Sequence, residues 1–242
     1  MLSDRYECGS WTRSVVSAPG FVRAAKGSRR AKPANDENSV TIHEAYAPIL
    51  RHFRRVRLRR LYLEFGINEE TRILDVGGSS FLWDLAHSMG LPEPRVTILN
   101  MAGKADILAD ATALPFADGS FDLAFSNSVI EHLFCFEKQV KMAAEIRRVG
   151  KSFWVQTPDV RFPVEPHYMA PFIHWMPRGA RHFLGRWMTP RGWMDSVGCS
   201  VLPQEVALLS PSAVRRLFPD AVLVVERFAF LPKSIIAVRN RM

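Results

Sequence analysis

The stretch 72–80 constrains the fold of this chain more than any other part of the sequence. It begins with a short apolar run, long enough for a strand that is buried on both faces of a sheet. Gly77 and Gly78 end that run, and because glycine has no Cβ, the chain can turn sharply there and a ligand can approach the backbone closely. Either of the two serines that follow can cap the helix predicted for 81–87. A strand, a glycine turn and a helix in this order present free backbone N–H groups at the end of the first strand of an α/β sheet.

The same alternation continues to the end of the chain. A helix is predicted over 134–148, and a second begins at Pro211 with Ser210 as its cap. The last two apolar runs leave no room for a helix between them, so we expect them to pair antiparallel. The pattern predicts an α/β fold with a doubly wound, seven-stranded, mostly parallel sheet and an antiparallel last strand. After the first strand, strands are predicted at 95–100, 105–110, 121–126, 152–156, 221–225 and 234–238.

Polar side chains stand at the ends of four of the predicted strands: Asp75, Asn100, Asp110 and Asn127. In open parallel sheets, ligands bind outside the carboxyl ends of the strands. These four residues should therefore gather on one edge of the sheet, although they lie far apart in the sequence. Their convergence is a more specific signal than the glycine turn alone, because short glycine patterns also occur in turns that bind nothing.

Charge divides the chain into two parts. Residues 1–60 carry 13 Lys and Arg against 5 Asp and Glu, whereas residues 61–242 carry 19 of each and are neutral. We interpret 1–40 as a disordered basic tail and 41–242 as one globular domain. A helix is expected from about Ser39 to Phe65, with an apolar side that includes Val56, and Pro48 allows a later start near Ala47. Its arginines predict a solvated helix face, or else contact with anionic lipid or nucleic acid.

Three blocks of the sequence, taken together, resemble class I S-adenosylmethionine-dependent methyltransferases, most closely the small-molecule branch called type 11. They are Ile73 to Gly78, Ala109 to Phe116 and Phe121 to Leu133. The resemblance implies a Rossmann-like methyltransferase domain over 41–242 and S-adenosylmethionine as its cofactor. Two departures from the family pattern are visible, because Ser79 and Phe81 replace the second and third glycines of the loop and Asn100 replaces the usual acidic residue.

The resemblance also implies a cofactor site. Asp75 and Gly77 would line the methionine part of the cofactor, and Gly78 belongs to the same turn. Asn100 would meet the ribose, Asp110 and the backbone of Ala111 would meet the adenine, and Asn127 would lie near the methionine carboxylate and the transferred methyl group.

The segment 159–195 is rich in aromatic residues, histidine and proline and follows the predicted fifth strand. The spacing of its apolar residues over 172–176 and 183–188 is typical of two short amphipathic helices. We expect it to form a lid over the acceptor pocket, with a face that could touch membrane lipid. The alternative is a packing extension that covers the sheet, since most aromatic stripes belong to a core.

Methyl transfer from a sulfonium needs little protein chemistry beyond alignment of the acceptor, although a general base helps when the acceptor is a hydroxyl. The candidates for that base are Glu131, His132 and His167, with Glu165 as an outsider. For His132, local packing or hydrogen bonding is the competing interpretation. The sequence shows no metal-ligand spacing, and its three widely separated cysteines are expected to be reduced thiols in a cytoplasmic protein.

The sequence therefore favours an enzyme that methylates a small molecule, with a lipid-linked or sugar acceptor as a candidate. Peripheral contact with an anionic membrane could involve the basic helix or the aromatic segment. A nucleic-acid methyltransferase is less favoured, because the residues from Ser126 to Val129 lack the Asn/Asp-Pro-Pro-aromatic signature. A nicotinamide-dependent dehydrogenase lacks the full glycine fingerprint. A methyltransferase-like binding protein without catalytic activity remains an alternative, since a fold does not fix a function.

Overall fold

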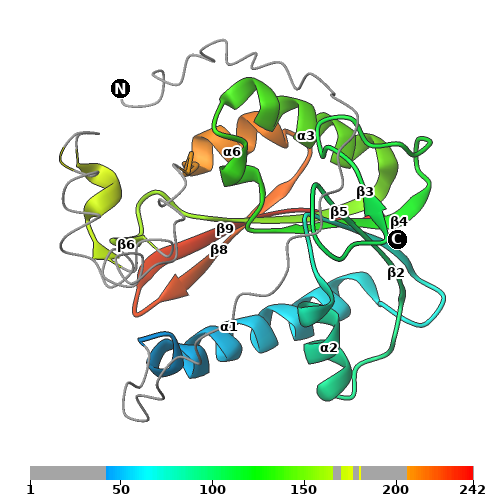
Figure 1. Ribbon diagram of the computed structural model, residues 1–242, viewed down its shortest axis with the longest axis horizontal. Coiled ribbons are helices and arrows are strands. Elements are labelled where there is room, and N and C mark those ends of the chain that lie inside the picture. Colours follow the sequence, from blue (N-terminus) through cyan, green and yellow to red (C-terminus); the bar gives the residue numbers. More distant parts are fainter. Residues whose placement is uncertain (1–41, 166–169, 177–179, 181–205, 242) are drawn as a thin grey trace, which may run out of the picture.

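The computed structural model of the chain describes residues 42–165, 170–176, 180 and 206–241. A seven-stranded sheet forms the middle layer, with helices on both of its faces (Figure 1). The strand order is β3-β2-β1-β4-β5-β9-β8, and β9 alone among these strands runs in the direction opposite to the rest. This confirms the predicted doubly wound sheet and its reversed last strand. The strands are β1 (Arg72–Val76), β2 (Arg95–Asn100), β3 (Ile107–Leu108), β4 (Phe121–Asn127), β5 (Gly150–Pro158), β8 (Val222–Phe228) and β9 (Leu231–Arg239).

The helices pack in pairs on the two faces of the sheet. Helices α1 (Ile42–Phe65) and α2 (Ser80–Ser88) lie on one face, and α3 (Phe136–Val149) and α6 (Pro211–Leu217) lie on the other (Figure 1). The Ser210 hydroxyl accepts a hydrogen bond from the backbone N–H of Ala213, so the predicted cap of α6 is confirmed. The shorter elements are η1 (Ile130–Leu133), η2 (Ile173–Trp175) and a separate pair of strands, β6 (Val164–Glu165) and β7 (Ala170–Pro171).

Alternation along the strands divides the core in two. In β5, Phe153 and Val155 pack with α3 and α6, whereas Trp154 between them packs with α1 and α2. Because successive side chains of a strand point to opposite faces, each central strand serves both cores at once. This explains why the central strands appear in the sequence as nearly continuous apolar runs rather than as alternating ones.

The edge strand β3 is shorter than predicted. Only Ile107 and Leu108 pair with β2, whereas the sequence indicated a strand over 105–110. Asp106 takes the place of further strand pairing, because its carboxylate accepts from the Ile98 N–H at 2.8 Å and its own N–H donates to the Ile98 carbonyl. A side chain thus satisfies a backbone group that a longer strand would have paired.

Helix α1 differs from the prediction in which side it buries. It begins at Ile42 and continues through Pro48, so a start near Ala47 is wrong. Val56, expected on the apolar side, is 50% exposed, while Arg57, expected on the solvated face, is buried. The buried positions follow the four-residue spacing from Arg57 to Leu61 and on to Phe65, so an arginine occupies a core position.

Two leucines of α1 provide a matched test of this burial. Leu61 is fully buried against the sheet, and Leu63, two residues later, is 85% exposed. We predict that Leu61→Ala lowers the free energy of unfolding by about 2–5 kcal/mol, since it removes transfer energy and leaves a cavity. Leu63→Ala should change it by no more than about 0.5 kcal/mol. Urea denaturation of both variants measures the difference, and equal losses would mean that α1 does not pack as described.

Candidate functional site

The turn after β1 is built so that only glycine fits at two successive positions. Gly77 has a φ of 77°, and a Cβ added there would lie 2.6 Å from a methyl carbon of Val129. A Cβ on Gly78 would lie 2.0 Å from Oδ2 of Asp75. The Gly77 N–H donates to the Leu99 carbonyl at 2.7 Å, which holds the turn against the end of β2. Ser79 occupies the N-cap position of α2, but its side chain makes no capping hydrogen bond.

Asp75 lies beneath this turn and is only 1% exposed. Trp83 Nε1 donates to its Oδ2 at 2.8 Å, while Oδ1 is buried without a hydrogen-bond partner among the described residues. Burial raises the pKa of Asp75 to about 7, although the hydrogen bond from Trp83 opposes this rise. The carboxyl group therefore holds one unused acceptor atom directly under the glycine turn.

Asn100 joins the second strand to the same turn. Its Nδ2 donates to the Gly78 carbonyl at 3.1 Å, and its Oδ1 accepts from the backbone N–H of Met101 at 2.8 Å. The amide thus orders the turn as well as standing at the predicted ribose position. This structural use accounts for a neutral amide at a position where the family usually has an acid, because a carboxylate could not donate to a carbonyl.

Asp110 and Ala111 follow β3 at the same edge of the sheet. Asp110 is exposed, and its Oδ1 accepts from the N–H of Thr112 at 2.8 Å and from the Thr112 hydroxyl at 2.9 Å. The backbone hydrogen bond from Thr112 is the main reason that the pKa of Asp110 lies below its usual value. Oδ2 makes no hydrogen bond to the described residues, so an ionised acceptor atom faces outward, and Ala111 is buried beside it.

Asn127 ends β4 within a buried polar network centred on Arg57 of α1. Arg57 Nη1 donates to Oδ1 of Asn127 and, at 3.3 Å, to Oε1 of Gln156 in β5. The other side of the guanidinium donates from Nε and Nη2 to the two carboxylate oxygens of Glu226, at 2.9 and 2.6 Å. Gln156 Oε1 also accepts from the Ser128 hydroxyl at 2.9 Å. One arginine thereby ties α1 to three strands.

Lys233 of β9 lies beside this network. Its Nζ stands 3.8 Å from the centre of the Phe53 ring, and its backbone carbonyl accepts from the N–H of Asp159. Burial, together with the charge of Arg57, lowers the pKa of Lys233 to about 8, against the opposing effect of Glu226. Burial alone would raise the pKa of Glu226, but its hydrogen bonds with Arg57 bring it below the ordinary value.

The sequence analysis missed four members of this network: Arg57, Gln156, Glu226 and Lys233. The signal for Gln156 was its position two residues after Trp154, since residues two apart in a strand share a face. Arg57 stands four residues from both Phe53 and Leu61, which places it on the buried side of the helix.

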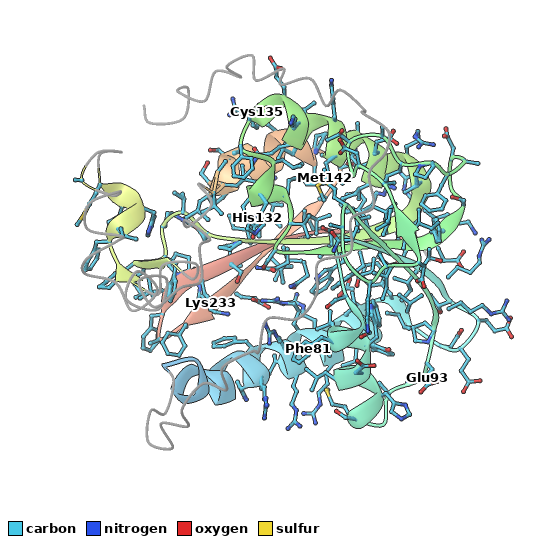
Figure 2. All side chains as sticks on the ribbon, in the orientation of Figure 1. Phe81, Glu93, His132, Cys135, Met142 and Lys233 are labelled. Carbon is cyan, nitrogen blue, oxygen red and sulfur yellow. The ribbon has the colours of Figure 1, made fainter. Side chains whose placement is uncertain are left out.

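The predicted catalytic residues lie elsewhere. Glu131 in η1 is fully buried and accepts a hydrogen bond from the Thr157 hydroxyl at 3.0 Å. His132 lies on the face of the sheet that carries α3, whereas Lys233 lies between the sheet and α1 (Figure 2). His167 falls outside the described residues, and only the backbone of Glu165 is described. A role for any of these groups as a general base stays a prediction.

The described part of the segment 159–195 follows β5 at the carboxyl edge. Val160 anchors it, because its carbonyl accepts from Trp175 Nε1 at 2.9 Å and lies 3.0 Å from His174 Nε2. The predicted helix over 172–176 is a short 3₁₀ turn, η2, and Phe162 contacts Phe228 of the β8–β9 hairpin. The second predicted helix, 183–188, lies outside the described residues, so a lid over the site stays a prediction.

One family model matches part of the chain, and the strand order of the sheet agrees with it. Residues 91–152 match a family model described as a methyltransferase domain, and the sheet has the strand order already given. Residues 91–152 therefore belong to a methyltransferase domain, and the strand order of the sheet is that of the class I S-adenosylmethionine-dependent methyltransferases. S-adenosylmethionine is the cofactor of this family.

Two curated proteins are similar to this chain over a short stretch. Two uncharacterized proteins of Mycobacterium tuberculosis, from two strains, are each 32% identical to it over 75 residues, 31% of this chain and 26% of the relative. The chain therefore spans about a quarter of the length of these curated relatives.

Two solved structures are similar over most of the methyltransferase. A SAM-dependent methyltransferase from Archaeoglobus fulgidus covers 78% of this chain and 94% of its own, with 14% identity and a TM-score of 0.48. A protein from Pyrococcus horikoshii covers 85% of this chain and 93% of its own, with 17% identity and a TM-score of 0.49. At these values the strand order, rather than any one neighbour, carries the fold assignment.

The residues of the methyltransferase fit its cofactor on two observations. The unpartnered Oδ1 of Asp75 can accept a hydrogen bond from an ammonium group such as that of the methionine moiety. The outward Oδ2 of Asp110 can accept from an exocyclic amine such as that of adenine. Among the described residues, no group of three or more His, Cys, Asp or Glu side chains could hold a metal ion.

We predict that Asp75→Asn changes how the stability of the methyltransferase depends on pH. In the folded state the pKa of Asp75 is about 7, against an ordinary value of 3.8. Between these values the folded protein keeps a proton that the unfolded chain has released, so stability falls as pH rises, by on the order of 1 kcal/mol per pH unit. The variant should lack this decline, because an amide does not titrate in this pH range. Its amide oxygen can still accept the hydrogen bond from Trp83, so the local structure is kept.

Urea denaturation from about pH 4 to about pH 8 measures the slope for both proteins. Asp118→Asn is the matched control, because that side chain is 81% exposed. A slope unchanged by Asp75→Asn would show that this carboxyl group titrates normally in the folded protein.

Proposed function

We propose that this chain transfers the methyl group of S-adenosylmethionine to a small-molecule acceptor. The observation that carries the proposal is the convergence of the glycine turn with Asn100, Asp110 and Asn127 at the carboxyl edge of the sheet. Ligands of open parallel sheets bind at this edge. The family of the chain supplies the cofactor, a sulfonium whose methyl group is already activated for transfer to a nucleophile.

The residues of the chain bind the donor and align it with the acceptor. Gly77 and Gly78 leave the backbone of the turn free of side chains, so that a ligand can lie against it. Asp110 would hold the adenine end, and the unused atom of Asp75 would hold the methionine end. Held at both ends, the donor is fixed relative to an acceptor beside β4 and β5, and such alignment supplies much of the rate.

A small acceptor suits the polar surroundings of Asn127 better than a nucleic acid does. The network of Arg57, Gln156 and Ser128 occupies the end of β4, and within the described part of the chain this network includes no aromatic side chain on which a flipped base could stack. The chain also lacks the Asn/Asp-Pro-Pro-aromatic signature after β4, since it has Ser128 and Val129 there. A lipid-linked or sugar acceptor is compatible with the same site.

Calorimetric titration with S-adenosylhomocysteine tests the cofactor site directly. We predict that Asp110→Ala weakens binding about tenfold or more, because it removes a charged hydrogen-bond acceptor. Asp110→Asn should keep the turn with Thr112 and fall between the wild type and the alanine variant, since an uncharged oxygen accepts more weakly. Glu69→Ala, in the exposed turn after α1, should leave binding unchanged. Failure of the wild-type protein to bind would overturn the proposed function.

We further propose peripheral contact with an anionic membrane at the tip of the β8–β9 hairpin. Phe230 at this tip is 93% exposed, and Phe228, Phe172 and Trp175 nearby expose about half of their surfaces or somewhat less. Arg51 and Arg55 of α1 are exposed as well. Aromatic side chains with basic neighbours favour the interface of an anionic bilayer. Among the described residues, no helix is long and apolar enough to cross a membrane.

Sedimentation with phosphatidylglycerol-containing vesicles tests this contact. We predict that Phe230→Ser lowers the bound fraction several-fold, whereas Val222→Ser does not, although Val222 is also exposed, at the other end of β8. Equal binding of both variants and the wild type would place any membrane contact elsewhere on the protein.

A further inference from the structure

Two positive charges at the carboxyl edge have no carboxylate partner among the described residues. The guanidinium of Arg54 lies 5.0 Å from the centre of the Phe81 ring, and Nζ of Lys233 lies 3.8 Å from that of Phe53. Neither cation forms an ion pair within the described part of the chain. Figure 2 shows Lys233 and Phe81 on the same side of the sheet, between it and α1.

The nearby carboxylate of Glu226 is already occupied. Both of its oxygens accept from Arg57, at 2.9 and 2.6 Å, and the Ser234 hydroxyl also bonds to it. Arg57 and Glu226 therefore neutralise each other, and their bidentate geometry leaves the carboxylate little capacity for another cation. Glu226 still attracts Lys233, but it is one carboxylate against the three cations Arg54, Arg57 and Lys233, so the cluster keeps a net charge of +2 (3 − 1).

Burial makes these two charges costly. Burial lowers the pKa of Arg54 and that of Lys233, and the charge of Arg57 lowers both further. Arg54 also acts on Lys233 electrostatically, so the two cations are close enough to repel each other. Partly desolvated like charges that outnumber their counter-ions destabilise a fold, and such groups are concentrated at sites that bind a ligand.

Arg54 and Lys233 lie on the side of the carboxyl edge where the acceptor, rather than the adenosine of the cofactor, is expected to bind. Lys233 joins the end of β5 through the hydrogen bond of its carbonyl with Asp159, and Pro158 pairs with Ser234. This is the β4–β5 side of the edge, next to Asn127, whereas Asp110 lies at its far side after β3. An anion held between Arg54 and Lys233 would lie close to the end of β4.

We propose that Arg54 and Lys233 bind a carboxylate or phosphate group of the acceptor, so that the substrate of this methyltransferase is an anionic small molecule. The inference rests on the proposed function, because it assigns the acceptor side of the same site. Arginine and lysine together suit such a group, since the guanidinium offers a planar fork of donors and the ammonium a compact charge.

Binding of inorganic phosphate and of acetate to the full chain saturated with S-adenosylhomocysteine tests the inference. Saturation keeps these probes out of the cofactor site, and calorimetry gives each affinity. We expect Lys233→Met and Arg54→Met each to weaken binding of the preferred anion about tenfold or more, the loss typical of a charged hydrogen bond. Lys233→Arg should retain most of the affinity. Lys151→Met, at the opposite end of β5 and paired with Asp122, should have no effect.

The outcomes separate this inference from the proposed function. Preference for phosphate or for acetate indicates a phosphorylated or a carboxylated acceptor, and either result supports the inference. If S-adenosylhomocysteine binds but neither anion does, or if Lys233→Met binds the anion as tightly as the wild type, the inference fails and the proposed function stands. If the anions bind only without S-adenosylhomocysteine, the two cations meet the carboxylate of the cofactor, and the inference fails. If S-adenosylhomocysteine itself does not bind, the proposed function fails.

Discussion

The bidentate pair between Arg57 and Glu226 holds the carboxyl edge of the sheet together. Helix α1 comes before the sheet in the chain, and its apolar contacts alone would fix only its packing against the face. Arg57 fixes the orientation of α1 on that face, because its guanidinium hydrogen-bonds to Glu226 of β8, Asn127 of β4 and Gln156 of β5 at once. A buried charge of this kind is costly when either partner is missing, so it favours one arrangement of α1 over alternatives that bury the same leucines.

The two faces of the sheet carry different kinds of polar group at this edge. On the face of α1 and α2, Asp75, Asn127 and Gln156 lie close to open backbone or to charged neighbours. On the face of α3 and α6, the buried Glu131 of η1 accepts a hydrogen bond from the Thr157 hydroxyl, and Gln139 of α3 donates to the carbonyl of Ile130. The second set stabilises a turn in the core, and the first set includes Asp75 and Asn127, which we propose to be part of the cofactor site.

The sequence was sufficient to predict the sheet because its central strands are buried on both faces. Such strands appear as uninterrupted apolar runs, and β2 has the bounds predicted for it. Strand β3 was overestimated, since the Asp106 side chain, which no pattern reveals, replaces part of its pairing. The side of α1 was misjudged at Arg57, because an arginine was assumed to be solvated and its partner Glu226 lies 169 positions away.

The convergence of the strand ends could be predicted from the sequence, but the orientation of their side chains could not. The strand ends at Asn100 and Asn127 meet at one edge, as the alternation of strands and helices required. The sequence could not show that the carboxyl group of Asp75 lies directly under Gly78, since this contact depends on how the glycine turn packs over the end of β1. Nor could it bring Lys233 to Arg54, because their proximity follows from the order in which strands pair across the sheet.

The reversal of β9 gives the chain a way to vary one half of its site. In the parallel strands the residues at the carboxyl edge are the last of each strand, followed by loops that would also line the proposed donor site. Strand β9 runs the other way, so its first residues, Leu231 to Ser234, reach that edge directly from the turn at Ala229 and Phe230. Changes of length or sequence in this hairpin would therefore reshape the acceptor half alone, and homologues with different substrates can be expected to diverge there while keeping the glycine turn.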